Sequence, residues 1–177
     1  MRIKEIITVA ALVASSLLAT TGTAVAASDG TNAARSATAR YHDIANAVAD
    51  GYRLLTDAAG IACIDKPGVG AMGVHYVKGS LVGDPRERAR TPELLVYEPR
   101  ENGRMRLVAL EYVVFQSDWQ QAGHTALPSL FGQTFAPVAA GNRFGLPAFY
   151  ELHAWIWKHN PSGKFADFNP SVSCEDD

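Results

Sequence analysis

The chain has 177 residues, of which 47% are hydrophobic and 19% are charged, and these proportions are typical of a globular protein with a substantial core. The formal net charge is only −2 and no basic stripe is visible, so no nucleic acid is expected as a partner. After the N-terminal segment, no apolar run reaches the roughly 20 residues of a membrane-spanning helix, so no membrane span is expected in the mature chain.

The N-terminal segment, residues 1–26, is typical of a secretory signal peptide. Arg2 and Lys4 supply a positive start, the apolar run 6–18 follows, and the small residues 24–26 (AVA) match a cleavage site. Cleavage near Ala26 predicts a secreted or extracytoplasmic protein. This location argues against most nucleotide cofactors.

The two cysteines, Cys63 and Cys174, are expected to form a disulfide bond, because an oxidising compartment favours pairing of an even number of thiols. The alternative is two buried free thiols. A bond between them would close a loop of about 110 residues and fix the C-terminal tail.

The rest of the chain is predicted to form one globular domain over residues 37–177, after a polar, disordered lead-in over residues 27–36. Residues 38–56 predict a helix, because apolar side chains recur there every three or four positions. This helix needs a surface to cover, and a sheet is the expected surface.

Four segments predict strands: 73–78, 93–98, 104–115 and 149–158. Asn102-Gly103 between the second and third segments favours a hairpin. One helix followed by such strands predicts an α+β fold. We expect one N-terminal helix packed on a curved antiparallel β-sheet, either open or partly closed into a barrel.

The glycine-rich segment 68–73 matches the G-x-G-x-x-G pattern of dinucleotide-binding proteins. That motif requires a strand before it and a helix after it, whereas here Lys66-Pro67 precedes and a strand-like run follows. We therefore expect these glycines to form a turn.

Three polar residues interrupt apolar strand patterns: His75, Glu111 and His153. Alternate residues of a strand share a face, so the three side chains can converge if these faces meet. Two imidazoles and one carboxylate suit a divalent transition metal such as Fe, Mn, Zn or Cu. Two alternatives remain open: a metal-free polar pocket, and structural hydrogen bonding in which Glu111 pairs with Arg106 or Arg143.

A pocket for a small-molecule ligand is expected around these residues, with a lining formed by Tyr76, Tyr112, Glu151, Trp155 and Trp157. No motif specifies a reaction, so catalysis stays open. The alternative is a non-catalytic protein of the cell envelope that binds no metal. Trp155 and Trp157 would then belong to an apolar contact surface.

Four segments carry a resemblance to known proteins: 70–76 (GAMGVHY), 95–99 (LVYEP), 110–114 (LEYVV) and 146–161 (LPAFYELHAWIWKHNP). Together they resemble a family of exported bacterial proteins of unknown function, over residues 39–174. The resemblance implies one domain and an exported location. It implies no catalytic residue.

Overall fold

A computed structural model describes residues 21–174, without the side chains of residues 21–29 and of Asn102. The charged start and apolar run of the predicted signal peptide lie outside the described residues. Among the residues that are described, no helix is both long enough and apolar enough to cross a membrane.

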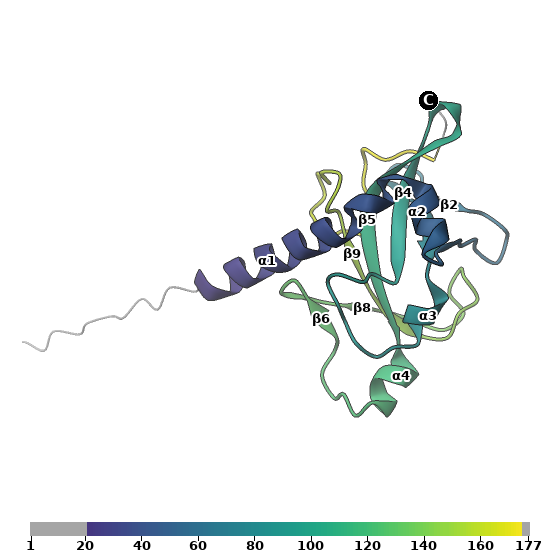
Figure 1. The fold of residues 1–177 in the computed structure, drawn as a ribbon. Helices are drawn as coiled ribbons and strands as arrows, with labels where there is room; N and C mark the ends of the chain where they lie inside the picture. Colours follow the sequence, from purple (N-terminus) through teal and green to yellow (C-terminus); the bar gives the residue numbers. More distant parts are fainter. Residues whose placement is uncertain (1–20, 175–177) are drawn as a thin grey trace, which may run out of the picture.

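The helices are short apart from the first (Figure 1). The α-helices are α1 (Thr21–Thr38), α2 (Ile44–Ala49), α3 (Gly79–Val82) and α4 (Gln116–Gln121), and the 3₁₀ helices are η1 (Ala39–His42) and η2 (Glu101–Gly103). The strands are β1 (Arg53–Leu54), β2 (Cys63–Lys66), β3 (Gly70–Val77), β4 (Leu94–Arg100), β5 (Arg104–Phe115), β6 (Ser129–Leu130), β7 (Gln133–Thr134), β8 (Ala136–Val138) and β9 (Phe149–Ala154).

Seven of the strands form one antiparallel sheet in the order β1-β3-β4-β5-β9-β8, with β2 also paired to β3. The α+β class is therefore confirmed. Within the described residues the end strands β1 and β8 do not pair with each other, so the sheet is open and the expectation of a partly closed barrel is wrong.

The central strands follow the sequence pattern closely. β5 has the predicted bounds, and β4 joins it through η2 at the Asn-Gly turn, with Arg100 opposite Arg104. β9 begins as predicted but ends at Ala154, four residues before the predicted end at Lys158.

The single helix predicted over residues 38–56 is not found. The chain there forms η1, α2 and β1. Asp43 interrupts the helical pattern: its backbone is extended, and its side chain accepts a hydrogen bond from the Ala45 N–H at 3.0 Å, which caps α2. Gly51 then takes a positive φ of 96°, which reverses the chain into β1.

The helix that leads into the domain is α1, and it contains residues 27–36, which were expected to be disordered. Figure 1 shows α1 running outward from the sheet toward its N-terminal end. Its last turns are fixed to the chain after β9. The Arg35 guanidinium lies 4.3 Å above the Trp157 ring, and the Trp157 indole N–H donates to the Thr38 hydroxyl at 3.2 Å.

Both faces of the sheet are covered. The face toward α1 and α2 carries the largest apolar cluster, which includes Tyr97, Leu110, Tyr112, Tyr150 and Leu152. The opposite face carries two smaller clusters, one around Val96, Ala109, Trp155 and Val172 and the other around Leu94, Val113 and Phe149. A polar side chain on this face, between the two smaller clusters, would have apolar residues on both sides that shield it from water.

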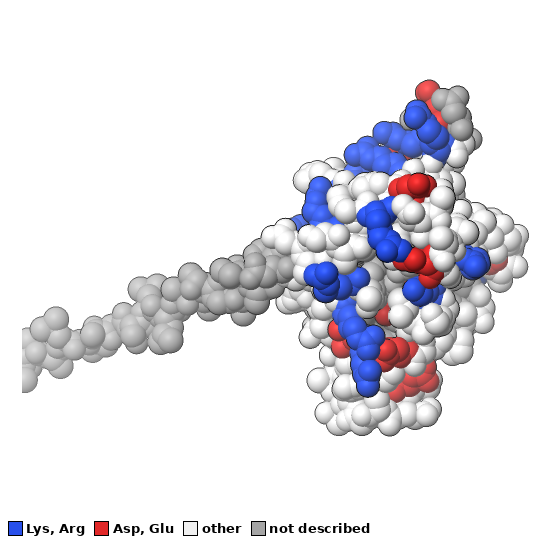
Figure 2. Space-filling view, viewed as in Figure 1, with Lys and Arg blue, Asp and Glu red and all other residues white. Residues whose placement is uncertain are grey.

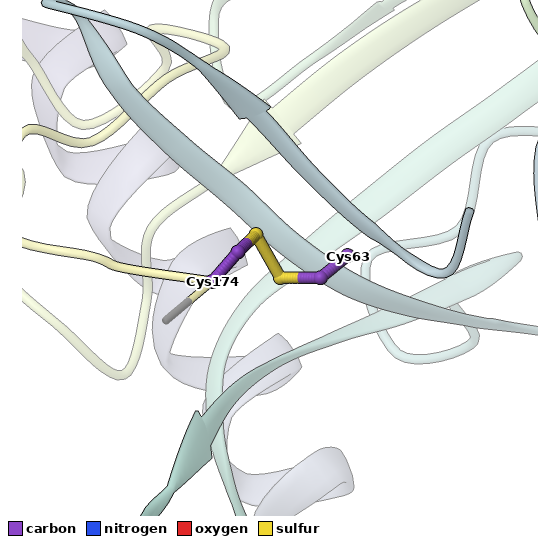
Figure 3. The surroundings of a disulfide bond; sticks show 2 residues. All are labelled: Cys63 and Cys174. Atoms are coloured by element: carbon purple, nitrogen blue, oxygen red, sulfur yellow. A yellow bond between two sulfur atoms is a disulfide. The ribbon is translucent and has the colours of Figure 1, made fainter. Parts of the chain in front are cut away.

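The C-terminal tail is tied to the sheet by the predicted disulfide bond (Figure 3). Cys63 of β2 bonds to Cys174, with 5.6 Å between the two Cα atoms and a sequence separation of 111. The bond holds Val172 against the smaller cluster that contains Trp155.

The glycine-rich segment was expected to form a turn, but only Gly68 lies in the turn between β2 and β3, whereas Gly70 and Gly73 belong to β3 and permit close backbone contacts. A Cβ atom on Gly70 would lie 2.3 Å from the Asn169 carbonyl oxygen of the tail, and one on Gly73 would lie 2.5 Å from the Tyr97 carbonyl oxygen of β4. A dinucleotide-binding motif requires a helix after these glycines, but here strand β3 continues instead. The glycines allow neighbouring backbone segments to pack closely.

The surface charges are mixed. Figure 2 shows Lys and Arg side chains at several places on one face, with Asp and Glu side chains between them. This distribution fits the small net charge of the chain.

Candidate metal site

Three strands of the sheet bring His75, Glu111 and His153 together. His75 lies on β3, Glu111 on β5 and His153 on β9. Glu111 is directly opposite His153 in the register of β5 and β9, whereas His75 reaches them from across β4. We call these three residues the triad.

The triad is compact and buried. The Nε2 atoms of His75 and His153 are 3.5 Å apart, and His75 Nε2 is also 3.5 Å from Glu111 Oε2. One ligand atom from each residue can be chosen so that all three lie within 4.8 Å of one another. Ligand atoms bound to one tetrahedral metal lie roughly 3.4 Å apart. The triad could therefore hold a metal ion.

Both histidines keep one ring nitrogen without a hydrogen bond. The Nδ1 atoms of His75 and His153 are buried and have no hydrogen-bond partner in the part of the chain that the structure describes. The side chains of these histidines are 1% and 0% exposed. A metal bound through the two Nε2 atoms would leave these Nδ1 atoms as they are, so they do not separate a metal site from a structural role.

Burial keeps the imidazoles neutral at physiological pH. It lowers the pKa of His75 to about 4, against the opposing effect of the Gly73 backbone, and lowers the pKa of His153 to about 3. The neutral imidazole is the form that binds metals. The contacts between these histidines and Glu111 are therefore not ion pairs at neutral pH.

Further carboxyl groups surround Glu111. Burial raises its pKa well above the ordinary value, and the charges of Glu151 and Asp167 raise it further. Glu151 lies two residues before His153 on the same face of β9 and shares a hydrogen bond with Glu111. A metal ion would have to displace the proton of Glu111, and its charge would favour that loss.

Aromatic rings lie beside both histidines. Phe144, from the segment between β8 and β9, meets the His75 ring edge to face at 6.5 Å between ring centres. Trp155 stacks beside His153 at 6.4 Å. These contacts limit the access of water to the triad.

A cavity of about 280 Å³ adjoins the triad through Glu111. Its walls are apolar and include Val77, Leu94, Val113 and Phe149 of the sheet, Val82 of α3 and Phe144. Among the described residues, Glu111 is the one titratable side chain in its lining. The triad therefore forms the polar end of an otherwise apolar cavity.

The structure assembles only part of the predicted ligand pocket. Glu151 and Trp155 lie on the face of the triad. Tyr76, Tyr112 and Trp157 pack with the large cluster on the opposite face. The two tyrosines follow the strand alternation to that face, because they are neighbours of His75 and Glu111. Trp157 lies beyond the end of β9, where alternation no longer applies.

Most residues that line the cavity were also not predicted from the sequence. Val82 and Phe144 come from a short helix and a loop, and Leu55 follows a two-residue strand. These segments carry no periodic pattern that would assign their side chains to the face of the triad.

Comparison with protein-family models, with curated proteins and with solved structures gives no match to this chain.

Proposed function

We propose that this protein binds a small molecule in the apolar cavity with the help of a divalent transition metal held by His75, Glu111 and His153. The observation that carries the proposal is the convergence of two buried, neutral imidazoles and one carboxyl group within 4.8 Å. Two imidazoles with one carboxylate suit Fe, Mn, Zn or Cu. A metal bound there would supply a Lewis acid for an oxygen-bearing ligand.

A purely structural role for the triad is less well supported. Neither arginine that such a role predicts for Glu111 has a recorded contact with it: Arg143 donates to Asp57 at 2.8 Å, and Arg106 is exposed whereas Glu111 is buried. A metal bound through the Nε2 atoms would not change the surroundings of the two buried Nδ1 atoms, so these atoms do not distinguish a metal site from a structural role.

The alternative, a cell-envelope protein that presents Trp155 and Trp157 to a partner, requires exposed indole rings. Trp155 is 3% exposed, and its N–H donates to the Ala166 carbonyl at 2.6 Å. Trp157 is partly buried against the last turn of α1. The contact surface that this alternative requires is not formed by these residues, which favours the ligand-binding proposal.

An exported location is part of the proposal. The Cys63–Cys174 disulfide bond supports it, since such bonds persist in oxidising compartments. The signal-like residues 1–26 support it independently.

Calorimetric titration of the chelator-treated protein with Zn(II), Mn(II), Cu(II) and, without oxygen, Fe(II) tests the metal site. The test variant is His75→Leu/His153→Leu, which fills the site with apolar groups. The control is His124→Leu/His159→Leu, because both of these histidines are exposed. We expect one ion per chain in the unmodified protein and the control, and binding weaker by about 100-fold or more in the test variant. Equal binding in all three proteins, or no binding of any of the four ions, would overturn the proposal.

A further inference from the structure

A second, smaller pocket lies between α1 and the chain that follows β9. Its volume is about 110 Å³. The described residues that line it are Thr31, Asn32 and Arg35 of α1 and, from the segment after β9, Trp155, Ile156 and Lys164. None of these residues belongs to the triad or lines the apolar cavity. The pocket is therefore a separate site, and an inference from it does not depend on the proposed metal.

The pocket carries two positive charges. Arg35 reaches it from α1, and Lys164 reaches it from the loop after β9. Neither side chain forms an ion pair with a carboxylate in the part of the chain that the structure describes, and no described Asp or Glu lines the pocket. A cationic ligand would be repelled here, whereas an anion would be attracted by both side chains.

The Arg35 guanidinium is held in position before any ligand binds. It lies 4.3 Å above the Trp157 ring, and its Nη1 group donates a hydrogen bond to the Ile156 carbonyl oxygen. A guanidinium has five N–H donors, so this hydrogen bond leaves others for a ligand. Because the side chain is already ordered, binding through it costs little additional conformational entropy.

The donors that a ligand can reach belong to side chains. The Lys164 ammonium and the Asn32 carboxamide offer further N–H groups at exposed positions. By contrast, the backbone N–H groups of Trp155 and Ile156 and the Trp155 indole N–H already donate to carbonyl oxygens of the chain. Charged and neutral donors thus meet above two buried apolar side chains, an arrangement that suits the oxygen atoms of an anion.

Size and charge together restrict the anion. A cavity of about 150 Å³ holds one benzene molecule, so a pocket of about 110 Å³ accommodates roughly four or five non-hydrogen atoms. Phosphate and sulfate groups are of this size and carry a charge of about −2, which matches the two cationic side chains. A carboxylate group is also small enough, but its single negative charge would balance only one of them.

We propose that this pocket binds a dianionic oxyanion, which is phosphate or sulfate either as the free ion or as a group on a larger molecule. Arg35 and Lys164 bind its oxygen atoms, and Asn32 donates a further hydrogen bond. Because the side chains of Asn32 and Lys164 are exposed, the remainder of a phosphate ester would extend into solvent.

Calorimetric titration of the full mature protein with sulfate, inorganic phosphate and acetate tests this assignment, at one constant ionic strength. We expect one sulfate or phosphate ion per chain, bound about tenfold or more tightly than acetate. Phenyl phosphate distinguishes the two sources: affinity equal to that of phosphate indicates a group on a larger molecule, and affinity lower by tenfold or more indicates the free ion. Equal binding of acetate and sulfate, or no saturable binding of sulfate and phosphate, would overturn the assignment.

Charge-matched variants locate the bound anion. Lys164→Gln and Arg35→Gln should each weaken sulfate binding about tenfold or more. Their controls are Lys66→Gln and Arg104→Gln, which remove the same charge at exposed positions outside the pocket and should leave binding unchanged.

The decisive variant is Lys164→Gln, because Arg35 also holds α1 against Trp157 and its replacement can disturb the fold. Lys164 is exposed, so its replacement should leave the free energy of unfolding within about 0.5 kcal/mol of the unmodified value. Sulfate binding that is insensitive to Lys164→Gln would contradict the inference. An equal loss in Lys66→Gln would also contradict it, since binding would then reflect only the total positive charge of the surface.

Discussion

His75 and His153 approach each other to 3.5 Å between their Nε2 atoms, although β4 and β5 lie between the strands that carry them. Neighbouring strands are about 4.8 Å apart, so the two backbones would be roughly 14 Å apart in a flat sheet. The sheet must therefore curve toward the face of the triad. The convergence also depends on register, because a shift of one residue would turn a histidine to the opposite face.

Removal of the buried carboxyl group should stabilise the metal-free protein. Burial and acidic neighbours raise the pKa of Glu111, so its charged form is costly in the folded state. We expect Glu111→Leu to raise the free energy of unfolding of the metal-free protein by about 1–3 kcal/mol while it abolishes metal binding. Urea denaturation measures the first effect and calorimetry the second.

The control for this substitution is Glu101→Leu, at an exposed position in η2. It should change the free energy of unfolding by less than about 0.5 kcal/mol. A loss of stability in Glu111→Leu would instead assign the carboxyl group a structural role.

The buried carboxyl group of Glu93 should contribute a decrease in stability as the pH rises from about 5 to 8. Burial raises the pKa of its carboxyl group from 4.5 to about 8, so the folded protein keeps a proton that the unfolded chain releases. This contribution is fully present below pH 4.5 and is lost as the pH rises toward 8, amounting to roughly 2–4 kcal/mol.

The variant Glu93→Gln isolates this effect, because its amide oxygen can still accept the hydrogen bond from the Val113 N–H. We expect it to be more stable than the unmodified protein at pH 8 and to show a flatter dependence of stability on pH. Urea denaturation between pH 5 and pH 8 provides the comparison. Parallel curves for the two proteins would contradict the assignment.

The central strands could be predicted because their side chains alternate over long, apolar segments. β5 has twelve residues and ends next to an Asn-Gly turn, so period and turn chemistry agree. The same alternation identified the polar residues of the triad. The alternation could not show that the sheet curves enough to bring side chains of β3 and β9 together across β4 and β5.

Other features depend on tertiary contacts that a periodic pattern does not report. Apolar side chains in residues 38–56 have helical spacing. However, Asp43 caps the short helix α2 within this segment, and the positive φ of Gly51 turns the chain after α2. Residues 27–36 are polar and small, yet the contact of Arg35 with Trp157 holds that end of α1 on the domain. The wall of the cavity comes from irregular segments and could not be assigned to a face.

Loss of the disulfide bond should reduce stability substantially, because it closes a loop between positions 111 residues apart. The variant Cys63→Ser/Cys174→Ser should lose about 3–5 kcal/mol in free energy of unfolding, chiefly through a less constrained unfolded state. The reduced, unmodified protein should match the variant in urea denaturation. Stability that is unaffected by both treatments would show that the tail is held without the bond.

Export should remove the signal-like segment. When the full chain is produced in a bacterial host, we expect protein recovered outside the cytoplasm to have the mass of residues 27–177, as measured by mass spectrometry. Ala24→Arg/Ala26→Arg should block this processing, because the cleavage site requires small residues. Accumulation of uncleaved protein in the cytoplasm for the unmodified chain would contradict the proposed location.

A metal held by His75, Glu111 and His153 can be detected by elemental analysis of the purified, tag-free mature protein. We expect close to one transition-metal ion per chain, either as purified or after reconstitution, and its loss in His75→Leu/His153→Leu but not in His124→Leu/His159→Leu. A metal content that is the same in both double variants, or metal-free protein after incubation with Fe(II), Mn(II), Zn(II) and Cu(II), would contradict it.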